Sequence, residues 1–109
     1  VAVPWAFAPG QFRADFAVIG ASAIDDDGTI LDFDYREVQV ARAIMANARR
    51  TILVADNLKF QRNAPVRSGE LSDIDYFVTD KAPPEPVLEI CRTHGVHLEV
   101  VDVETGEKP

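Results

Sequence analysis

Asp56 and Lys59, three residues apart, are the charged pair in this sequence best suited to holding a ligand. A lysine ammonium is a compact positive charge with three donors, which suits a phosphate or a hydroxyl-rich ligand. Asp56 directly follows a short apolar run, 51–55, that predicts a buried strand. The carboxylate can therefore pair with the lysine and hold it at the strand end. The alternative is a solvated loop lysine, and the spacing to Asp56 favours a binding role.

A second group of candidate residues follows the apolar run 16–19. Gly20 permits a sharp turn or a close approach of a ligand to the backbone, with a plain strand-to-loop turn as the alternative. Ser22 and Asp25 lie in the loop behind it. Ligands collect at the carboxyl ends of the strands in open parallel sheets, so we expect this loop and the loop carrying Lys59 to converge.

Three further charged residues have both a structural and a functional interpretation. Glu37 lies three positions after Asp34, which is the spacing of a capping box, but its carboxylate also suits sugar hydroxyls. Arg62 and Arg67 either complete an anion site or neutralise neighbouring acids. The predicted effector-binding set therefore comprises Gly20, Ser22, Asp25, Glu37, Asp56, Lys59, Arg62 and Arg67.

Other chemistries find little support in the residue pattern. The acidic run 25–27 lacks the ligand spacing of an EF-hand loop and predicts a solvated turn. His94 and His97 flank Gly95 at a predicted helix end, where cap and surface roles are favoured. Cys91 is expected in the core. With no nucleophile and base in a suitable pattern and no phosphate-cradling glycine loop, we expect neither catalysis, nor a metal, nor a cofactor.

The elements that must position these residues alternate along the chain. Helical periodicity predicts helices over 34–50 and 85–94, and 57–71 is a polar-rich segment without an assigned element. Apolar runs predict strands over 16–19, 29–33, 51–55, 76–79 and 97–101. Strands that alternate with helices indicate an α/β fold in three layers around a mostly parallel sheet.

Composition narrows the classes of protein further. The 109 residues are 47% hydrophobic, which is enough for one small packed domain. A formal charge of -7 disfavours direct binding of nucleic acid, although a local basic pocket for a small anion remains compatible with it. No apolar run is long enough for a transmembrane helix. The single cysteine fits a cytoplasmic location.

Taken in order, four stretches carry a family resemblance: Arg13–Ile44, Ile52–Arg67, Leu71–Asp80, and the prolines Pro83 and Pro84. Within them, the segments DFDYREV and ADNLKFQRNAPVR are the most distinctive. The chain resembles the carboxy-terminal sensing domain of DeoR-family transcriptional repressors across roughly Gln11–Val101. Ala23 and Gln61 depart from the pattern, because related sequences often have glycine there.

The resemblance implies a fold similar to ribose-5-phosphate isomerase. Glu37, Asp56 and Lys59 match its helix-start Glu and its strand-end Asp-x-x-Lys, and Gly20 and Ser22 lie on the matching first loop. It also implies that a phosphorylated sugar or polyol, such as glycerol 3-phosphate, binds there and weakens operator binding. A homo-oligomer is implied as well, together with contact to DNA through an amino-terminal winged helix-turn-helix that this chain lacks.

On this interpretation, residues 1–103 are a partial effector-sensing domain, truncated at its amino end, and 104–109 are a polar tail. The opening, 1–10, matches the family poorly. Two alternatives remain open. One is a sugar-phosphate isomerase-like enzyme fragment with Glu37 as general base. The other is a structural oligomerisation domain, which predicts no ligand at the crevice between Gly20 and Lys59.

Overall fold

The structure is a computed structural model, and it describes residues 13–101. The predicted tail, 104–109, and the poorly matching opening, 1–10, lie outside the described residues. The elements in chain order are β1 (Ala14–Ile19), β2 (Ala23–Ile24), β3 (Thr29–Asp32), α1 (Tyr35–Ala46), β4 (Ala48–Val54), the 3-10 helix η1 (Asn57–Gln61), β5 (Val66–Glu70), the 3-10 helix η2 (Leu71–Asp73), β6 (Tyr76–Thr79), α2 (Glu85–His94) and β7 (His97–Val100).

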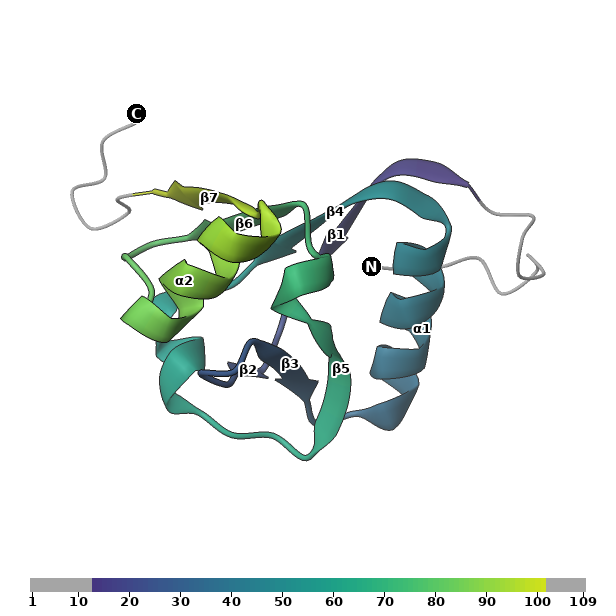
Figure 1. The fold of residues 1–109 in the computed structure, drawn as a ribbon. Coiled ribbons are helices and arrows are strands. Elements are labelled where there is room, and N and C mark those ends of the chain that lie inside the picture. The colour runs from purple at the N-terminus through teal and green to yellow at the C-terminus, as the bar shows by residue number, and fades with distance from the viewer. Residues whose placement is uncertain (1–12, 102–109) are drawn as a thin grey trace.

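Strands β1, β4, β6 and β7 pair in that order to form a parallel sheet (Figure 1). Ile19 at the end of β1 lies opposite Leu53 on β4, and Thr79 on β6 lies opposite Val100 on β7. The mostly parallel α/β sheet that the sequence predicts is thus confirmed. Since β1 and β4 are parallel neighbours, the loops that begin at Gly20 and Asp56 leave the same edge of the sheet.

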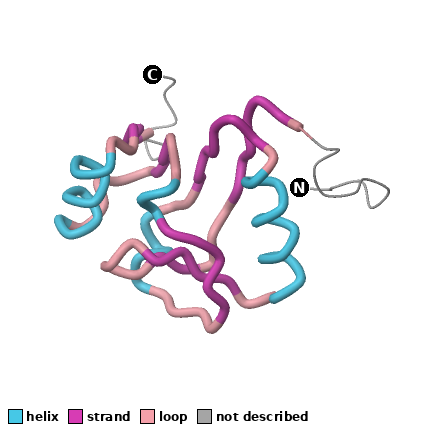
Figure 2. The backbone as a smooth tube through the Cα atoms, turned by 45° about the vertical axis from the view of Figure 1, so that its right-hand side comes forward, coloured by secondary structure: helices cyan, strands magenta, loops and turns pink. Residues whose placement is uncertain are grey.

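One face of the parallel sheet forms the hydrophobic core. Ile19, Leu53 and Phe77 point into it from three strands and join a cluster with Val87 and Cys91 of α2. Removing a side chain of this size from water contributes roughly 1.5–3 kcal/mol. Both α-helices lie beneath this same face of the sheet (Figure 1). Figure 2 shows them at opposite ends of the molecule, with strands between them.

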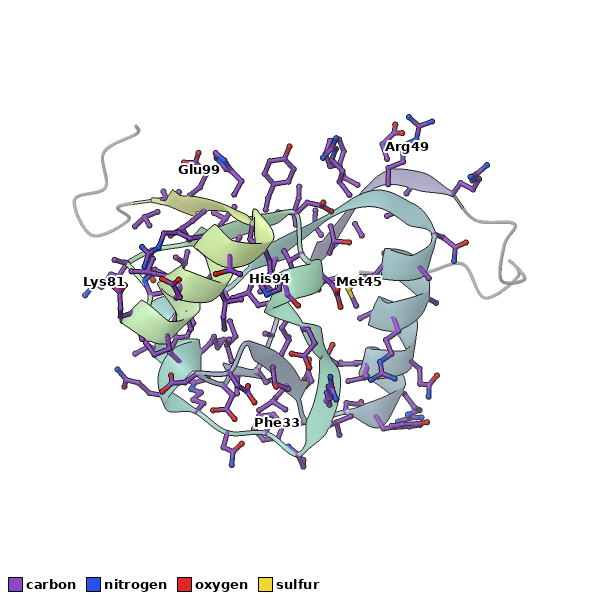
Figure 3. All side chains as sticks on the ribbon, viewed as in Figure 1. Phe33, Met45, Arg49, Lys81, His94 and Glu99 are labelled. Carbon is purple, nitrogen blue, oxygen red and sulfur yellow. The ribbon has the colours of Figure 1, made fainter. Side chains whose placement is uncertain are left out.

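The opposite face of the sheet carries apolar side chains that remain exposed. Phe16 is 56% exposed, Val18 48% and Val54 47%. Figure 3 shows side chains standing on this upper side, Glu99 among them. Parallel sheets are normally covered on both faces. Of the three layers that the sequence predicts, residues 13–101 supply the sheet and the layer beneath it.

A second, antiparallel sheet of β2, β3 and β5 lies beneath the first and was not anticipated from the sequence. β5 falls in the polar-rich segment 57–71, for which the sequence predicts no element, because Val-Arg-Ser-Gly-Glu lacks a clear apolar alternation. Ile30 on β3 pairs with Gly69 on β5. Ile24 and Ile30 are almost fully buried, so this small sheet completes the floor of the core.

Helix α1 ends four residues earlier than the periodicity predicts. The backbone N–H of Asn47 donates to the Ile44 carbonyl, and its side-chain amide donates to the Ala43 carbonyl at 2.8 Å. These bonds close the helix. The expectation that Arg49 and Arg50 would end it is wrong, because both residues belong to β4.

Helix α2 has the bounds that the sequence predicts, Glu85–His94. Pro86 lies in its first turn, and Gly95 closes it in the left-handed conformation with φ of 71°. Val87 and Cys91 are buried on one side of the helix. Within residues 13–101, neither helix has the length and apolar character needed to cross a membrane.

Candidate functional site

The loop that follows β1 lines a pocket against α1. The pocket has a volume of about 500 Å³, a size typical of small-molecule sites. Residues 18–22 form one wall, and α1 contributes Arg36, Glu37, Val40, Ala41 and Ile44 to the other. Three of the residues predicted from the sequence, Gly20, Ser22 and Glu37, therefore line one pocket.

Asp32, at the end of β3, ties the loop to the pocket wall. The Ser22 hydroxyl donates to Oδ1 of Asp32 at 2.7 Å, and the Phe33 backbone N–H donates to the same oxygen at 2.8 Å. The Ser22 backbone N–H also donates to the Leu31 carbonyl at 3.0 Å. These bonds fix the course of the loop, so the pocket wall is organised before any ligand arrives.

The start of α1 leaves Glu37 available to a ligand. Asp34 caps the helix as predicted, because its carboxylate accepts the Arg36 backbone N–H at 2.8 Å. The second half of the predicted capping box is not formed: among residues 13–101, Glu37 makes no hydrogen bond to the Asp34 backbone. Its exposed carboxylate lines the pocket instead.

The predicted pair of Asp56 and Lys59 forms at the end of the neighbouring strand. The Lys59 ammonium donates to Oδ2 of Asp56 at 3.3 Å. Asp56 also caps η1, since its Oδ1 accepts the Leu58 backbone N–H at 3.0 Å. Partial burial raises the pKa of Asp56, but the hydrogen bonds from Lys59 and Leu58 outweigh it and hold the pKa below its usual value. The carboxylate is therefore ionised and engaged at neutral pH.

The two strand ends are close, but the pair of Asp56 and Lys59 lies outside the lining of the pocket. A Cβ placed on Gly20 would be 3.8 Å from the Val54 carbonyl oxygen, so the first loop passes close to the end of β4. The pocket is lined instead by the end of β1, the loop that follows it, Asp32 and α1. A role for Asp56 and Lys59 in binding stays a prediction.

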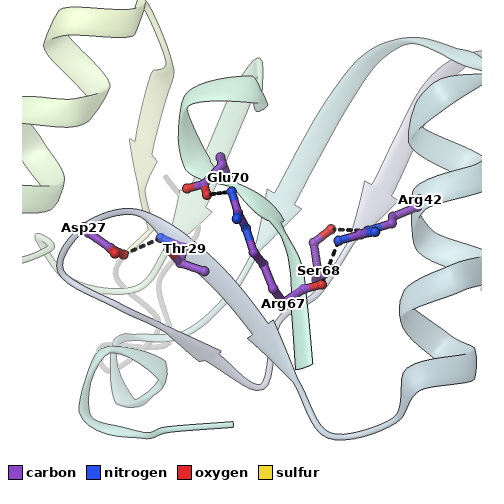
Figure 4. Close-up of polar contacts among 6 residues, drawn as sticks. All are labelled: Asp27, Thr29, Arg42, Arg67, Ser68 and Glu70. Atoms are coloured by element: carbon purple, nitrogen blue, oxygen red, sulfur yellow. Dashed lines mark hydrogen bonds and ion pairs between the residues drawn. The ribbon is translucent and has the colours of Figure 1, made fainter. Parts of the chain in front are cut away.

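The remaining predicted residues lie elsewhere. Arg67, on β5, pairs with Glu70 of its own strand (Figure 4). Arg62 caps the end of η1 and is exposed. Asp25 lies in the β2–β3 turn, where its carboxylate accepts the Asp26 backbone N–H at 2.9 Å. None of these three residues lines the pocket beside α1.

Neighbouring residues support the turn and β5 rather than a binding site. The Thr29 backbone N–H donates to Asp27 at 2.9 Å, and hydrogen bonding with Thr29 lowers the pKa of Asp27. Arg42 of α1 donates to the carbonyl oxygens of Ser68 at 3.3 Å and Arg67 at 3.0 Å. Figure 4 shows this arginine reaching from α1 to β5. It fastens the helix to the antiparallel sheet.

Two pocket residues, Asp32 and Arg36, were not among those predicted. The apolar stripe of α1 places Arg36 on the solvent side of the helix when the sequence is considered alone. Only the position of β1 beside that helix shows that Arg36 faces a cavity. The sequence groups Asp32 with Asp34 and Glu37 as carboxylates suited to sugar hydroxyls, but nothing in that spacing singles it out as a site residue.

Chemically, the pocket combines one arginine, two carboxylates, a serine and an apolar floor. Carboxylates accept hydrogen bonds from hydroxyl groups, and a guanidinium matches an anionic phosphate. The arrangement suits a small ligand that carries both kinds of group.

Comparison with known proteins shows which family the chain resembles. The family described as "DeoR C terminal sensor domain" matches residues 8–81. The glycerol-3-phosphate regulon repressor of Escherichia coli is 47% identical over 90 residues, which cover 83% of this chain and 36% of the relative. The repressor of the same name from Haemophilus influenzae is 59% identical over 73 residues, covering 67% and 29%.

A more distant relative is the transcriptional repressor CsqR of Escherichia coli, 40% identical over 74 residues, which cover 68% of this chain and 28% of that protein. The chain thus spans about a third of the length of the curated relatives it matches. The resemblance drawn from its four sequence stretches is confirmed, and two of the relatives that carry it are glycerol-3-phosphate regulon repressors.

Proposed function

Since this chain belongs to the DeoR family, as part of its carboxy-terminal sensor domain, we propose that it binds a phosphorylated polyol or sugar in the pocket between β1 and α1. The observation that carries the proposal is the convergence of Gly20, Ser22 and Glu37 on one cavity. The sequence alone predicts all three of these residues as ligand contacts. Ser22 and Glu37 are 15 positions apart in the sequence, so their convergence depends on the fold.

Glycerol 3-phosphate is the effector that we propose. Glu37 and Asp32 offer oxygen acceptors to its hydroxyl groups. The name of the relatives at 47% and 59% identity, glycerol-3-phosphate regulon repressor, supports the same ligand for this chain. A protein with this role carries out no reaction on its ligand, and it needs neither a metal nor a cofactor.

The proposed consequence of binding is a change in repression by a longer protein. An effector shifts a conformational equilibrium only by the difference between its affinities for the two states. We propose that the two states belong to a homo-oligomer that contacts DNA through a separate amino-terminal domain. Effector binding would then weaken operator binding by a coupling free energy of about 1–3 kcal/mol. Such a regulator acts in the bacterial cytoplasm.

Isothermal titration calorimetry of the full chain with glycerol 3-phosphate tests the ligand. We expect saturable binding, weakened roughly tenfold by Glu37→Gln, because a charged hydrogen-bond acceptor is lost. Glu99→Gln, on β7, is the charge-matched control and should leave the affinity unchanged. Binding of ribose 5-phosphate without binding of glycerol 3-phosphate would overturn the ligand assignment. If neither compound binds, the proposed function fails.

A further inference from the structure

Arg36 is the one cationic side chain lining the pocket between β1 and α1, as far as residues 13–101 define its walls. We propose that Arg36 receives the phosphate of the effector, while Glu37 and Asp32 admit only an uncharged, hydroxylated end. The pocket then selects a phosphorylated polyol over a phosphorylated acid of the same length. This inference rests on the proposed function of the pocket. It adds how the ligand is oriented there and which ligands the pocket prefers.

Arg36 is better placed than Lys59 to bind the phosphate, because its charged group is not already engaged. Within the described residues, the Arg36 guanidinium makes no hydrogen bond and no ion pair, so all of its donors remain available. The Lys59 ammonium is instead engaged by Asp56 at 3.3 Å, and its side chain is only 22% exposed. An arginine also offers a planar fork of donors, which matches two phosphate oxygens at once.

The sequence positions of Arg36 and Glu37 separate the two charges in the pocket. Adjacent residues on a helix project about 100° apart and do not face each other. Arg36 and Glu37 therefore do not pair with each other, and they present opposite charges at separate points of the pocket lining. Val40 and Ala41 lie one turn further along the helix, below Arg36 and Glu37 respectively, and add apolar lining to the pocket. A ligand with a short carbon backbone fits this pattern when its two ends differ in charge.

Asp32 increases the preference for an uncharged group at the end of the ligand opposite the phosphate. Its Oδ1 already accepts hydrogen bonds from the Ser22 hydroxyl and the Phe33 backbone N–H. The carboxylate is thus held in place and contributes negative charge beside Glu37. A second anionic group on the ligand, such as a carboxylate, would meet two like charges there. A hydroxyl group carries no charge and can donate a hydrogen bond to either acid.

The test compares two ligands that differ at one end, glycerol 3-phosphate and 3-phosphoglycerate, by calorimetry on the full chain. We expect glycerol 3-phosphate to bind at least about tenfold more tightly, and Glu37→Gln to narrow that ratio. Arg36→Ala should weaken glycerol 3-phosphate binding roughly tenfold or more, with Arg36→Lys intermediate. Arg50→Ala, which removes an exposed arginine from β4, is the matched control and should have no effect.

The dependence of binding on pH provides a second readout. A phosphate monoester loses its second proton near pH 6. Contact with Arg36 predicts that affinity rises between pH 5 and pH 7, and that Arg36→Ala reduces this rise. Circular dichroism of each variant establishes that it is folded before its affinity is compared.

Different results overturn different conclusions. If glycerol 3-phosphate binds Arg36→Ala as tightly as the unsubstituted chain, while Lys59→Ala abolishes binding, the phosphate lies at Lys59 and this inference is wrong. Equal affinity for the two ligands in the unsubstituted chain would contradict the selectivity. If the unsubstituted chain binds no phosphorylated polyol or sugar, the proposed function fails, and the inference fails with it.

Discussion

Cys91 lies on the buried side of α2, where its side chain is 4% exposed and packs in the core cluster. Burial raises the pKa of its thiol, since the thiolate loses its hydration, and the positive charge of Arg92 opposes this only in part. Thiolate is the nucleophilic form of cysteine. The folded protein therefore keeps this side chain protonated and shielded from reagents.

We expect Cys91 to react with iodoacetamide much more slowly in the folded chain than in denaturant at pH 8. The raised pKa also has a consequence for stability: its contribution is complete below the unfolded thiol pKa of about 8.5 and is lost as the pH rises through the folded value. Denaturation measured from pH 7 to 10 should show less alkaline loss of stability in Cys91→Ala. Equal alkylation rates in the folded and unfolded chain would contradict the assignment of Cys91 to the core.

At the level of single residues, the sequence predicted local pairings well and spatial groupings less well. The contacts of Asp56 with Lys59 and of Asp34 with the start of α1 follow from short spacings, and both are present. Arg36 was missed because its environment comes from β1, which lies far away in the chain. Arg62 lies outside the pocket lining, but its positive charge helps to lower the pKa of Asp56, which fits the predicted neutralisation of a neighbouring acid. A role for Arg62 in binding stays a prediction.

Two glycines with positive φ illustrate how secondary-structure elements are joined. Gly28, with φ of 88°, forms the β2–β3 turn beneath α2, and Gly95, with φ of 71°, ends α2 at the surface. A Cβ on Gly28 would lie 3.0 Å from Cδ1 of Ile90 and 3.5 Å from Cβ of Leu71, whereas a Cβ on Gly95 would meet nothing within 4 Å. Both positions disfavour alanine conformationally, and only the first is also crowded.

We expect Gly95→Ala to lower the free energy of unfolding by about 1–2 kcal/mol, the cost of a left-handed L-residue. Gly28→Ala should cost roughly 1 kcal/mol more, because the Ile90 side chain must shift away from the added methyl group. Urea denaturation of both variants measures the difference. Ile90→Val combined with Gly28→Ala should recover part of the extra loss. Equal losses for the two glycine variants would show that α2 does not press on the turn.

At the level of elements, the sequence predicted the helices and strands with strong local patterns and missed those with weak ones. α2 has a proline at its start, a glycine after its end and an apolar side, and its bounds were predicted correctly. β5 carries little apolar patterning, because its pairing with β3 and the support of Arg42 hold it in place instead. Stabilisation by a distant partner leaves no local signal in the sequence.

At the scale of the whole molecule, the face of the parallel sheet that residues 13–101 leave uncovered is the largest departure from a closed fold. Phe16, Val18 and Val54 lie on it with about half of their surface exposed. Grouped apolar side chains of this kind promote self-association in water. The described residues also leave β1 and β7 as sheet edges with unpaired backbone groups.

We expect the chain to bind apolar dyes such as ANS and to self-associate as its concentration rises. Phe16→Ser together with Val54→Thr should reduce both effects while changing the free energy of unfolding by only about 0.5 kcal/mol for each substitution, since both side chains are already exposed. Phe77→Ala, in the core, is the contrasting variant and should cost roughly 3–5 kcal/mol. Sedimentation velocity and dye fluorescence measure the outcome. Unchanged self-association in the double variant would show that this face is not responsible.

The uncovered face also affects how stability depends on temperature. Unfolding normally raises the heat capacity by about 12–15 cal/mol/K per residue, because it newly exposes apolar surface to water. Phe16, Val18 and Val54 are already hydrated in the folded chain, so they add little to that increase. A smaller heat-capacity change flattens the stability curve. The chain should therefore lose stability gradually on either side of its optimum, and a partner that covers the sheet would make the curve steeper as well as higher.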